Sequence, residues 1–167
     1  SPDGCINNES MLVSVFYTPP IPVIPDSVQM CVGSSIAITV SGGDSYVWSP
    51  NYKINQLTGP TVIVSPADDF IYYCNFINAC GFVLDSVLVK VVEATILAGS
   101  DTIICPGESA ILWASGGISY SWSPMATLNN STLSQVIATP TSSTLYTVIG
   151  IDSTGCIDTA YVQVDLY

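Results

Sequence analysis

Short runs of alternating apolar and polar residues recur along the chain. Segment 160–166 places Ala160, Val162, Val164 and Leu166 at every second position, between Tyr161, Gln163 and Asp165. Segments 87–91 and 11–15 show the same alternation. A period of two puts apolar side chains on one face of a β-strand. No stretch has a helical period of useful length, so we expect an all-β protein.

The strand pattern belongs to an internal repeat. Residues 31–50 align without a gap to residues 105–124, an offset of 74, and 11 of the 20 aligned positions are identical. Self-similarity of this kind indicates tandem modules. Residues 1 to about 17 resemble the last strand of a preceding repeat, which suggests a chain cut from a longer array.

Turn residues and one tryptophan recur in each repeat. Ser-Gly-Gly at 41–43 and 115–117 stands between two strands, where glycine supplies positive φ for a turn. Trp48 and Trp122 are expected to be core anchors, as in sandwich domains generally. Tyr46 and Tyr120 lie two residues earlier and should share their face. The alternative role for the tryptophans is a platform on which sugars stack.

These patterns predict two β-sandwich modules arranged head to tail as a rod. We expect a terminal strand and Pro-rich joint at 1–20, one module at 21–93 and a second at 94–167. The proline-rich stretch 18–25 should act as a stiff spacer, because proline favours extended backbone. The joint at 92–95 is short.

Charge and composition exclude several functions. The 167 residues contain 13 carboxylates, Lys53 and Lys90 as the only cations, and no histidine, for a net charge of -11. Nucleic acids and anionic membrane surfaces both require clustered Lys or Arg. No apolar run reaches the ~18 residues of a membrane helix. We therefore expect neither nucleic-acid binding nor membrane insertion.

Six cysteines in an acidic chain that lacks histidine favour disulfides and an oxidising, extracellular compartment over zinc. Cys31 and Cys80 occupy places equivalent to Cys105 and Cys156, so one disulfide within each module is the simplest pairing. Cys5 should pair with a preceding module. Cys74 is expected to be a buried free thiol, and a Cys5–Cys74 bridge is the alternative.

Catalytic groups are missing from the sequence. Without histidine, neither a Ser-His-Asp triad nor a Cys-His pair can form. Asp68-Asp69 is the one adjacent acidic pair, and a solvent-exposed turn explains it better than glycosidase chemistry. We expect no enzyme and no cofactor. A calcium ion bound at a module joint is an alternative, but the spacing of the acidic residues does not match a calcium-binding motif.

The motifs of the second module carry a family resemblance. Cys-Pro-Gly-Glu-Ser (105–109), Ser-Gly-Gly-Ile-Ser-Tyr-Ser-Trp-Ser-Pro (115–124), Thr-Pro-Thr-Ser-Ser-Thr-Leu-Tyr-Thr-Val (139–148) and Asp-Ser-Thr-Gly-Cys (152–156) resemble PKD/Ig-like repeats of very large Bacteroidetes surface proteins. These include gliding-motility adhesins exported by the type IX secretion system. The first module departs from the pattern at Ala79-Cys80-Gly81. The resemblance implies Ig-like/PKD-like sandwiches in the stalk of a cell-surface adhesin or filament.

A short motif of that phylum also recurs. Asp followed by Ser or Thr and then an apolar residue or Thr resembles its O-glycosylation motif. The candidate acceptors are Ser27, Ser86, Thr102, Ser153 and Thr159. Ordinary strand-edge sequence is the alternative explanation.

Three functions follow from the sequence. The first is a stalk segment whose partners are neighbouring repeats of the same polypeptide. The second is a carbohydrate-binding module of a secreted hydrolase, for which Tyr52, Tyr73 and Tyr161 would form a flat patch. The third is a filament subunit that self-associates by strand addition of residues 11–15.

Overall fold

The structure is a computed structural model that describes residues 18–167. The expected terminal strand within residues 1–17, and Cys5 with it, lies outside the described residues. The described residues form 13 strands and one short 3-10 helix, η1 (Met125–Thr127), so the expected all-β fold is confirmed.

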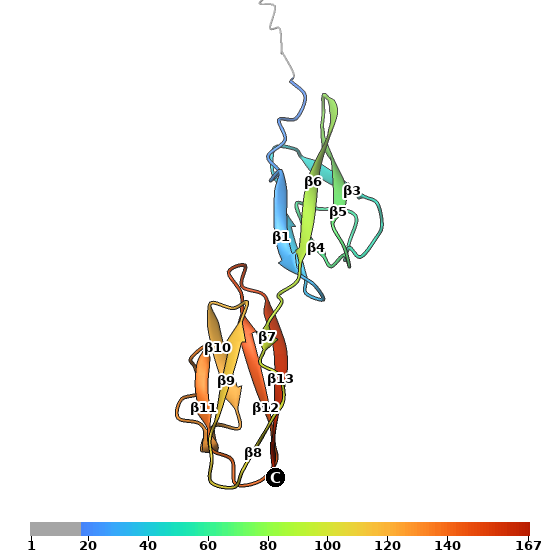
Figure 1. Cartoon of the computed structure of the whole chain (residues 1–167). Coiled ribbons are helices and arrows are strands. Elements are labelled where there is room, and N and C mark those ends of the chain that lie inside the picture. The colour runs from blue at the N-terminus through green and yellow to red at the C-terminus, as the bar shows by residue number, and fades with distance from the viewer. Residues whose placement is uncertain (1–17) are drawn as a thin grey trace, which may run out of the picture.

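The strands fall into two groups that share no sheet. We call the first group the N-terminal module and the second the C-terminal module, and Figure 1 shows them end to end. The N-terminal module contains β1 (Ser27–Cys31), β2 (Ile36–Thr39), β3 (Ser45–Ser49), β4 (Thr61–Val64), β5 (Phe70–Asn78) and β6 (Gly81–Val92). The C-terminal module contains β7 (Leu97–Ala98), β8 (Thr102–Ile104), β9 (Ala110–Ser115), β10 (Ser119–Ser123), β11 (Gln135–Ala138), β12 (Thr144–Ile151) and β13 (Ile157–Leu166).

Each module is a sandwich of two sheets, and the four-stranded sheets of the two modules have the same strand order. Sheet β1-β6-β5-β3 faces the pair β2-β4, and sheet β8-β13-β12-β10 faces β11-β9-β7. All pairings are antiparallel except β1 with β6 and β8 with β13, which are parallel. Two mainly antiparallel sheets packed around one core form the immunoglobulin-like sandwich that the sequence predicted.

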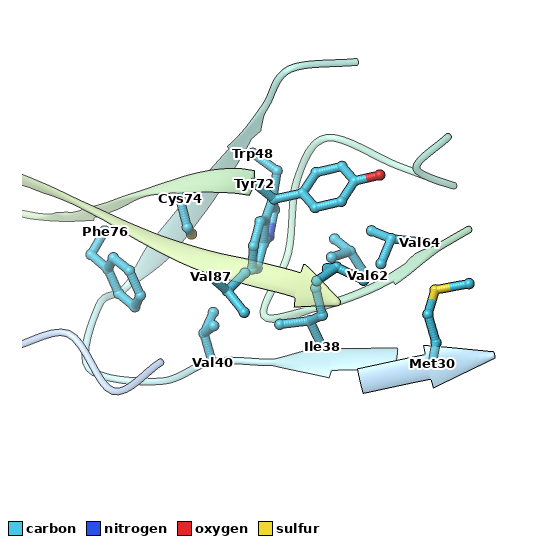
Figure 2. Packing of buried hydrophobic residues seen from close by; sticks show 11 residues of the cluster. Met30, Ile38, Val40, Trp48, Val62, Val64, Tyr72, Cys74, Phe76 and Val87 are labelled. Atoms are coloured by element: carbon cyan, nitrogen blue, oxygen red, sulfur yellow. The ribbon is translucent and has the colours of Figure 1, made fainter. Parts of the chain in front are cut away.

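A separate hydrophobic core fills each sandwich. Figure 2 shows Ile38 and Val62 from one sheet of the N-terminal module pointing toward Trp48 and Tyr72 of the other. The alternation read from the sequence decides which residues face inward: Val162 and Val164 on β13 are buried, whereas Tyr161 between them is exposed. The C-terminal core has the same composition, with Ile96, Leu112, Trp122, Val136, Tyr146, Val148, Val162 and Val164 among its buried members.

The recurring tryptophans lie at corresponding places in the two cores. Trp48 and Trp122 are each 1% exposed. Their indole Nε1–H groups donate to the carbonyl oxygens of Gly59 and Leu133, both over 3.0 Å. A buried indole needs such an acceptor, because an unpaired donor away from water is costly. Both indole rings are therefore part of the core and are not exposed for sugars to stack on.

Tyr46 and Tyr120 are half-buried at the edge of each core. Each phenolic oxygen donates to the second glycine carbonyl of the Ser-Gly-Gly turn, over 2.7 Å to Gly43 and 2.8 Å to Gly117. It also accepts from that glycine's N–H group. The two tyrosines thus fix the turn that each module presents to the chain arriving from upstream.

Candidate functional site: the joint between the modules

The backbone of the joint is short and lies against the C-terminal module. Strand β6 ends at Val92 and β7 begins at Leu97, so only residues 93–96 connect the modules. Ala94 and Ile96 are buried, with 5% and 4% exposure, while Glu93 and Thr95 face solvent. A linker that buries every second side chain has much less freedom to swing than a solvated one.

A carboxylate at the start of β13 holds the linker. Asp158 Oδ2 accepts from the N–H of Ile96 over 2.9 Å, and Oδ1 accepts from the N–H of Thr159 over 2.7 Å. These hydrogen bonds, the one from Ile96 first, lower the pKa of the Asp158 carboxyl, since they favour its charged form. The linker is therefore tied to the C-terminal module at a backbone amide as well as through the buried Ile96 side chain.

The first glycine of each Ser-Gly-Gly turn lets the incoming chain pass close by. Gly116 has φ +91°, and a Cβ there would overlap the carbonyl oxygen of Thr95. Gly42 has φ +102°, and a Cβ there would overlap the carbonyl oxygen of Ile21. The positive φ expected from the sequence is present at both. The close approach of the upstream segment is a second requirement for glycine, which the sequence did not reveal.

A disulfide joins the modules at a second point. Cys31, at the end of β1, is bonded to Cys156, which stands just before β13, with 5.5 Å between the two Cα atoms. The Cys156 sulfur also lies 3.9 Å from the carbonyl oxygen of Val92, the last residue of β6. The bond therefore runs beside the peptide linker and closes a sequence separation of 125 residues.

This bond corrects the pairing expected from the sequence, and the disulfides Cys31–Cys80 and Cys105–Cys156 are wrong. Because β1 runs parallel to β6, Cys31 lies opposite Val92 at the end of β6, whereas Cys80 immediately precedes its beginning. Strand β6 has 12 residues, which separates its two ends by about 40 Å at ~3.3 Å per residue. A disulfide requires Cα atoms within about 7 Å.

The same geometry separates the cysteines of the C-terminal module. Cys105 follows β8, whose last residue Ile104 pairs with Leu166 at the end of β13. Cys156 immediately precedes Ile157 at the beginning of β13, a strand of 10 residues. Cys80 and Cys105 are unpaired among the described residues, as is the buried Cys74, whose free thiol the sequence predicted.

An ordered loop presents Cys156 to the joint. Asp152 Oδ1 accepts from the N–H of Thr154 over 2.8 Å, from its Oγ1 hydroxyl over 2.7 Å and from the N–H of Cys156 over 2.9 Å. The hydroxyl hydrogen bond of Thr154 and the backbone N–H groups together lower the pKa of the Asp152 carboxyl. The Asp-Ser-Thr-Gly-Cys motif is thus a side-chain-stabilised turn that orients the cysteine.

The candidate glycosylation residues are distributed over both modules. Ser27 on β1 and Ser153 in the Asp152 loop are exposed. Ser86 on β6, Thr102 on β8 and Thr159 on β13 are half-buried. The structure brings no pair of them into a common loop, and attachment of sugar to any of them stays a prediction.

Other candidate sites are not assembled by the fold. Tyr52 and Tyr73 belong to the N-terminal module and Tyr161 to the C-terminal module, and Tyr52 stacks on Phe70 with 4.8 Å between ring centroids. Within residues 18–167, no three His, Cys, Asp or Glu side chains are grouped so that they could hold a metal ion. Asp69 of the acidic pair accepts from the N–H of Val91 over 2.7 Å, which gives it a structural role.

Within the described range, the structure contains no helix that is both long and apolar enough to span a membrane.

The likeness of the chain to known proteins is limited to solved structures of low similarity. No known protein family matches the sequence, and no curated protein matches it. The chain resembles the solved structure of DIP-gamma IG1+IG2 at 14% identity, covering 89% of this chain and 98% of that one, with a TM-score of 0.38. It resembles the insect immune protein hemolin at 16% identity, covering 89% of this chain and 47% of that one, with a TM-score of 0.42.

A fragment of the titin I-band, I67–I69, is similar at 16% identity, covering 87% of this chain and 65% of that one, with a TM-score of 0.40. Because these TM-scores lie below 0.5 and the identities below 25%, the likeness carries no conclusion about function. The assignment of each module to the immunoglobulin-like sandwiches follows from its own strand order and packing.

Proposed function

We propose that the chain is a stiff segment of an extracellular stalk, in a bacterial adhesin or surface filament that mediates adhesion or gliding. The observation that carries the proposal is the joint, where a four-residue linker and the Cys31–Cys156 disulfide connect the same two modules. One peptide connection leaves two domains free to bend and twist about it. A second covalent connection beside the first removes most of that freedom.

The other features of the joint support the same function. The linker amide bonds to Asp158, and its apolar side chains Ala94 and Ile96 are buried. A disulfide persists in an oxidising compartment outside the cell, where a stalk would have to resist force and proteolysis. Neighbouring repeats of the same polypeptide are the proposed partners, and modules 21–93 and 94–167 are the proposed repeat units. The resemblance to Bacteroidetes repeats supports a cell surface reached through type IX secretion, and O-glycosylation belongs to the same proposal.

Stiffness of the joint is measurable in solution. Residual dipolar couplings of the backbone N–H groups should fit a single alignment tensor for both modules in the oxidised chain. The variant Cys31→Ser/Cys156→Ser should give two different tensors, because the modules then reorient about the linker. Cys80→Ser/Cys105→Ser is the matched control and should behave like the natural chain. Two unrelated tensors in the oxidised chain would contradict a stiff joint.

The location of the segment tests the stalk itself. Electron microscopy of the native surface material, labelled with an antibody against this chain, should place the label along a thin fibre. The fibre should show a repeat near 40 Å, which is about the length of a sandwich whose longest strand has 12 residues. Label on a compact secreted protein with a catalytic domain would instead support an accessory binding module.

A further inference from the structure

Each module carries one cysteine at each of its ends. Cys31 is the last residue of β1 and Cys105 directly follows β8, the first strand of the main sheet in each module, at the end where the chain leaves the module. Cys80 and Cys156 lie in the last hairpin, at the opposite end. The Cys31–Cys156 bond connects the end at which the chain leaves the N-terminal module to the end at which it enters the C-terminal module. This leaves Cys80 and Cys105 unpaired at the two outer ends of the described pair.

Cys105 has the backbone setting of Cys31. The carbonyl oxygen of Cys31 accepts from the N–H of Ser34 over 3.1 Å, and that of Cys105 accepts from the N–H of Glu108 over 3.0 Å. Gly33 and Gly107 stand at the same turn position, with φ +74° and +89°. Both cysteines therefore leave their strand in the same turn, and Cys105 is exposed where a following module would stand.

Cys80 has the setting of Cys156. The N–H of Cys80 donates to Asn78 Oδ1 over 2.9 Å, and the N–H of Cys156 donates to Asp152 Oδ1 over the same distance. Asn78 and Asp152 are 74 residues apart, the offset of the repeat. Asn78 stands two residues before Cys80 and Asp152 four residues before Cys156. In both hairpins, however, a side-chain oxygen accepts from the N–H of the cysteine at the tip.

We propose that Cys80 and Cys105 are the two halves of further inter-module disulfides, identical in kind to Cys31–Cys156. The partner of Cys105 is a cysteine in the last hairpin of a following module, and the partner of Cys80 is a cysteine at the end of the first strand of a preceding module. Every joint of the array is then closed by two covalent connections. The inference rests on the proposed stalk for the existence of neighbouring modules, and it adds how they are held.

Formation of each bond is a thiol–disulfide exchange with an oxidised low-molecular-weight or enzyme-bound disulfide. The thiolate of one cysteine attacks that disulfide, which forms a mixed disulfide and releases one thiolate. The thiolate of the second cysteine then attacks the protein sulfur and releases the other. Each thiol loses one proton to solvent, and the reagent disulfide takes up the two electrons.

A tandem fusion reproduces the missing joint. The full chain is followed, directly after Tyr167, by a second copy of residues 19–167, and Cys5 is replaced by Ser to remove a competing thiol. Pro19 and Pro20 then separate Tyr167 from Ile21, as Glu93 and Ala94 separate Val92 from Thr95. The fusion is oxidised with oxidised glutathione, unreacted thiols are alkylated, and the disulfides are mapped by mass spectrometry without reduction.

We expect a bond between Cys105 of the first copy and Cys80 of the second, together with Cys31–Cys156 in each copy. The buried Cys74 should remain a thiol in both copies. The inference is overturned if both Cys31–Cys156 bonds form, which reports folded modules, while Cys105 and the second Cys80 remain thiols. That outcome would not contradict the proposed stalk function, because the electron microscopy and the residual dipolar couplings that test it do not depend on Cys80 or Cys105.

A second experiment uses separate chains and needs no new joint to fold. One full chain carries Cys5→Ser/Cys80→Ser, the other Cys5→Ser/Cys105→Ser, and they are mixed in a glutathione redox buffer. Only the mixture offers one Cys105 and one Cys80, so a covalent dimer should form there at least tenfold more than in either chain alone. Equal dimer yields in the mixture and in the single chains, with no bond in the fusion, would refute the inference.

Discussion

When the chain is stretched, the Cys31–Cys156 disulfide should prevent most of its residues from being extended. When the chain is pulled by its ends, tension enters along the backbone as far as Cys31, crosses the disulfide and leaves from Cys156. The residues between them carry no load, even if both modules unfold. The bond spans 125 residues, which would extend to about 440 Å at ~3.5 Å per residue.

The perturbation is removal of this bond, by reduction or by Cys31→Ser/Cys156→Ser. In single-molecule force spectroscopy the contour length gained on complete unfolding should rise by about 440 Å relative to the oxidised chain. Each sandwich has its own buried core, so the variant should still show two separate unfolding events. Cys80→Ser/Cys105→Ser serves as the control and should keep the short extension.

The same bond should also affect equilibrium stability. In the chain-entropy treatment, a closed loop of 125 residues stabilises the folded chain against concerted unfolding of the two modules by about 5 kcal/mol. Urea denaturation of the oxidised chain and of the double serine variant measures this difference. The account of the joint would be refuted by equal contour lengths with and without the bond, since force would then not pass through Cys31 and Cys156.

Three further predictions concern single residues. Gly116→Ala should destabilise the C-terminal module by about 2 kcal/mol or more in urea denaturation, because it combines a positive φ with overlap between the new Cβ and the Thr95 carbonyl oxygen. The control Gly107→Ala has nearly the same φ but open space around the Cβ, so it should lower the free energy of unfolding by only ~1 kcal/mol, and equal destabilisation by the two variants would contradict the contact. Burial raises the pKa of the Cys74 thiol to about 11, so at pH 8 iodoacetamide should alkylate it far more slowly than the exposed thiol of Cys105. Rapid alkylation of Cys74 in the native chain would argue against its burial. The folded-state pKa of Asp158 lies below its unfolded value, so its contribution to stability is present above pH ~4 and is lost as pH falls through the folded pKa. Asp158→Asn should therefore be less stable than the natural chain at pH 7, by a difference that shrinks as the pH falls below ~4, and a difference independent of pH would contradict the role of the charge.

Local sequence determined the strands and the core of each module. The period of two at 160–166 decides that Val162 and Val164 point inward, because successive side chains of a strand alternate between its faces. The repeat offset of 74 residues indicated that Trp48 and Trp122 have the same role, and both donate an indole hydrogen bond to a backbone carbonyl in the same way. These features depend on neighbours a few residues away, or on the general need to bury apolar surface, so a sequence pattern can carry them.

Only the tertiary structure decided how the cysteines pair. Sequence equivalence grouped Cys31 with Cys105 and Cys80 with Cys156, which identified matching positions but did not say at which end of a module each position lies. The parallel pairing of β1 with β6 places Cys31 beside Val92, about 40 Å from Cys80, and the stacking of the second module brings Cys156 to it. Strand direction and module stacking arise from contacts between residues far apart in the chain. For that reason the second covalent connection at the joint emerged only from the folded molecule, although the repeat in the sequence had already suggested a stalk.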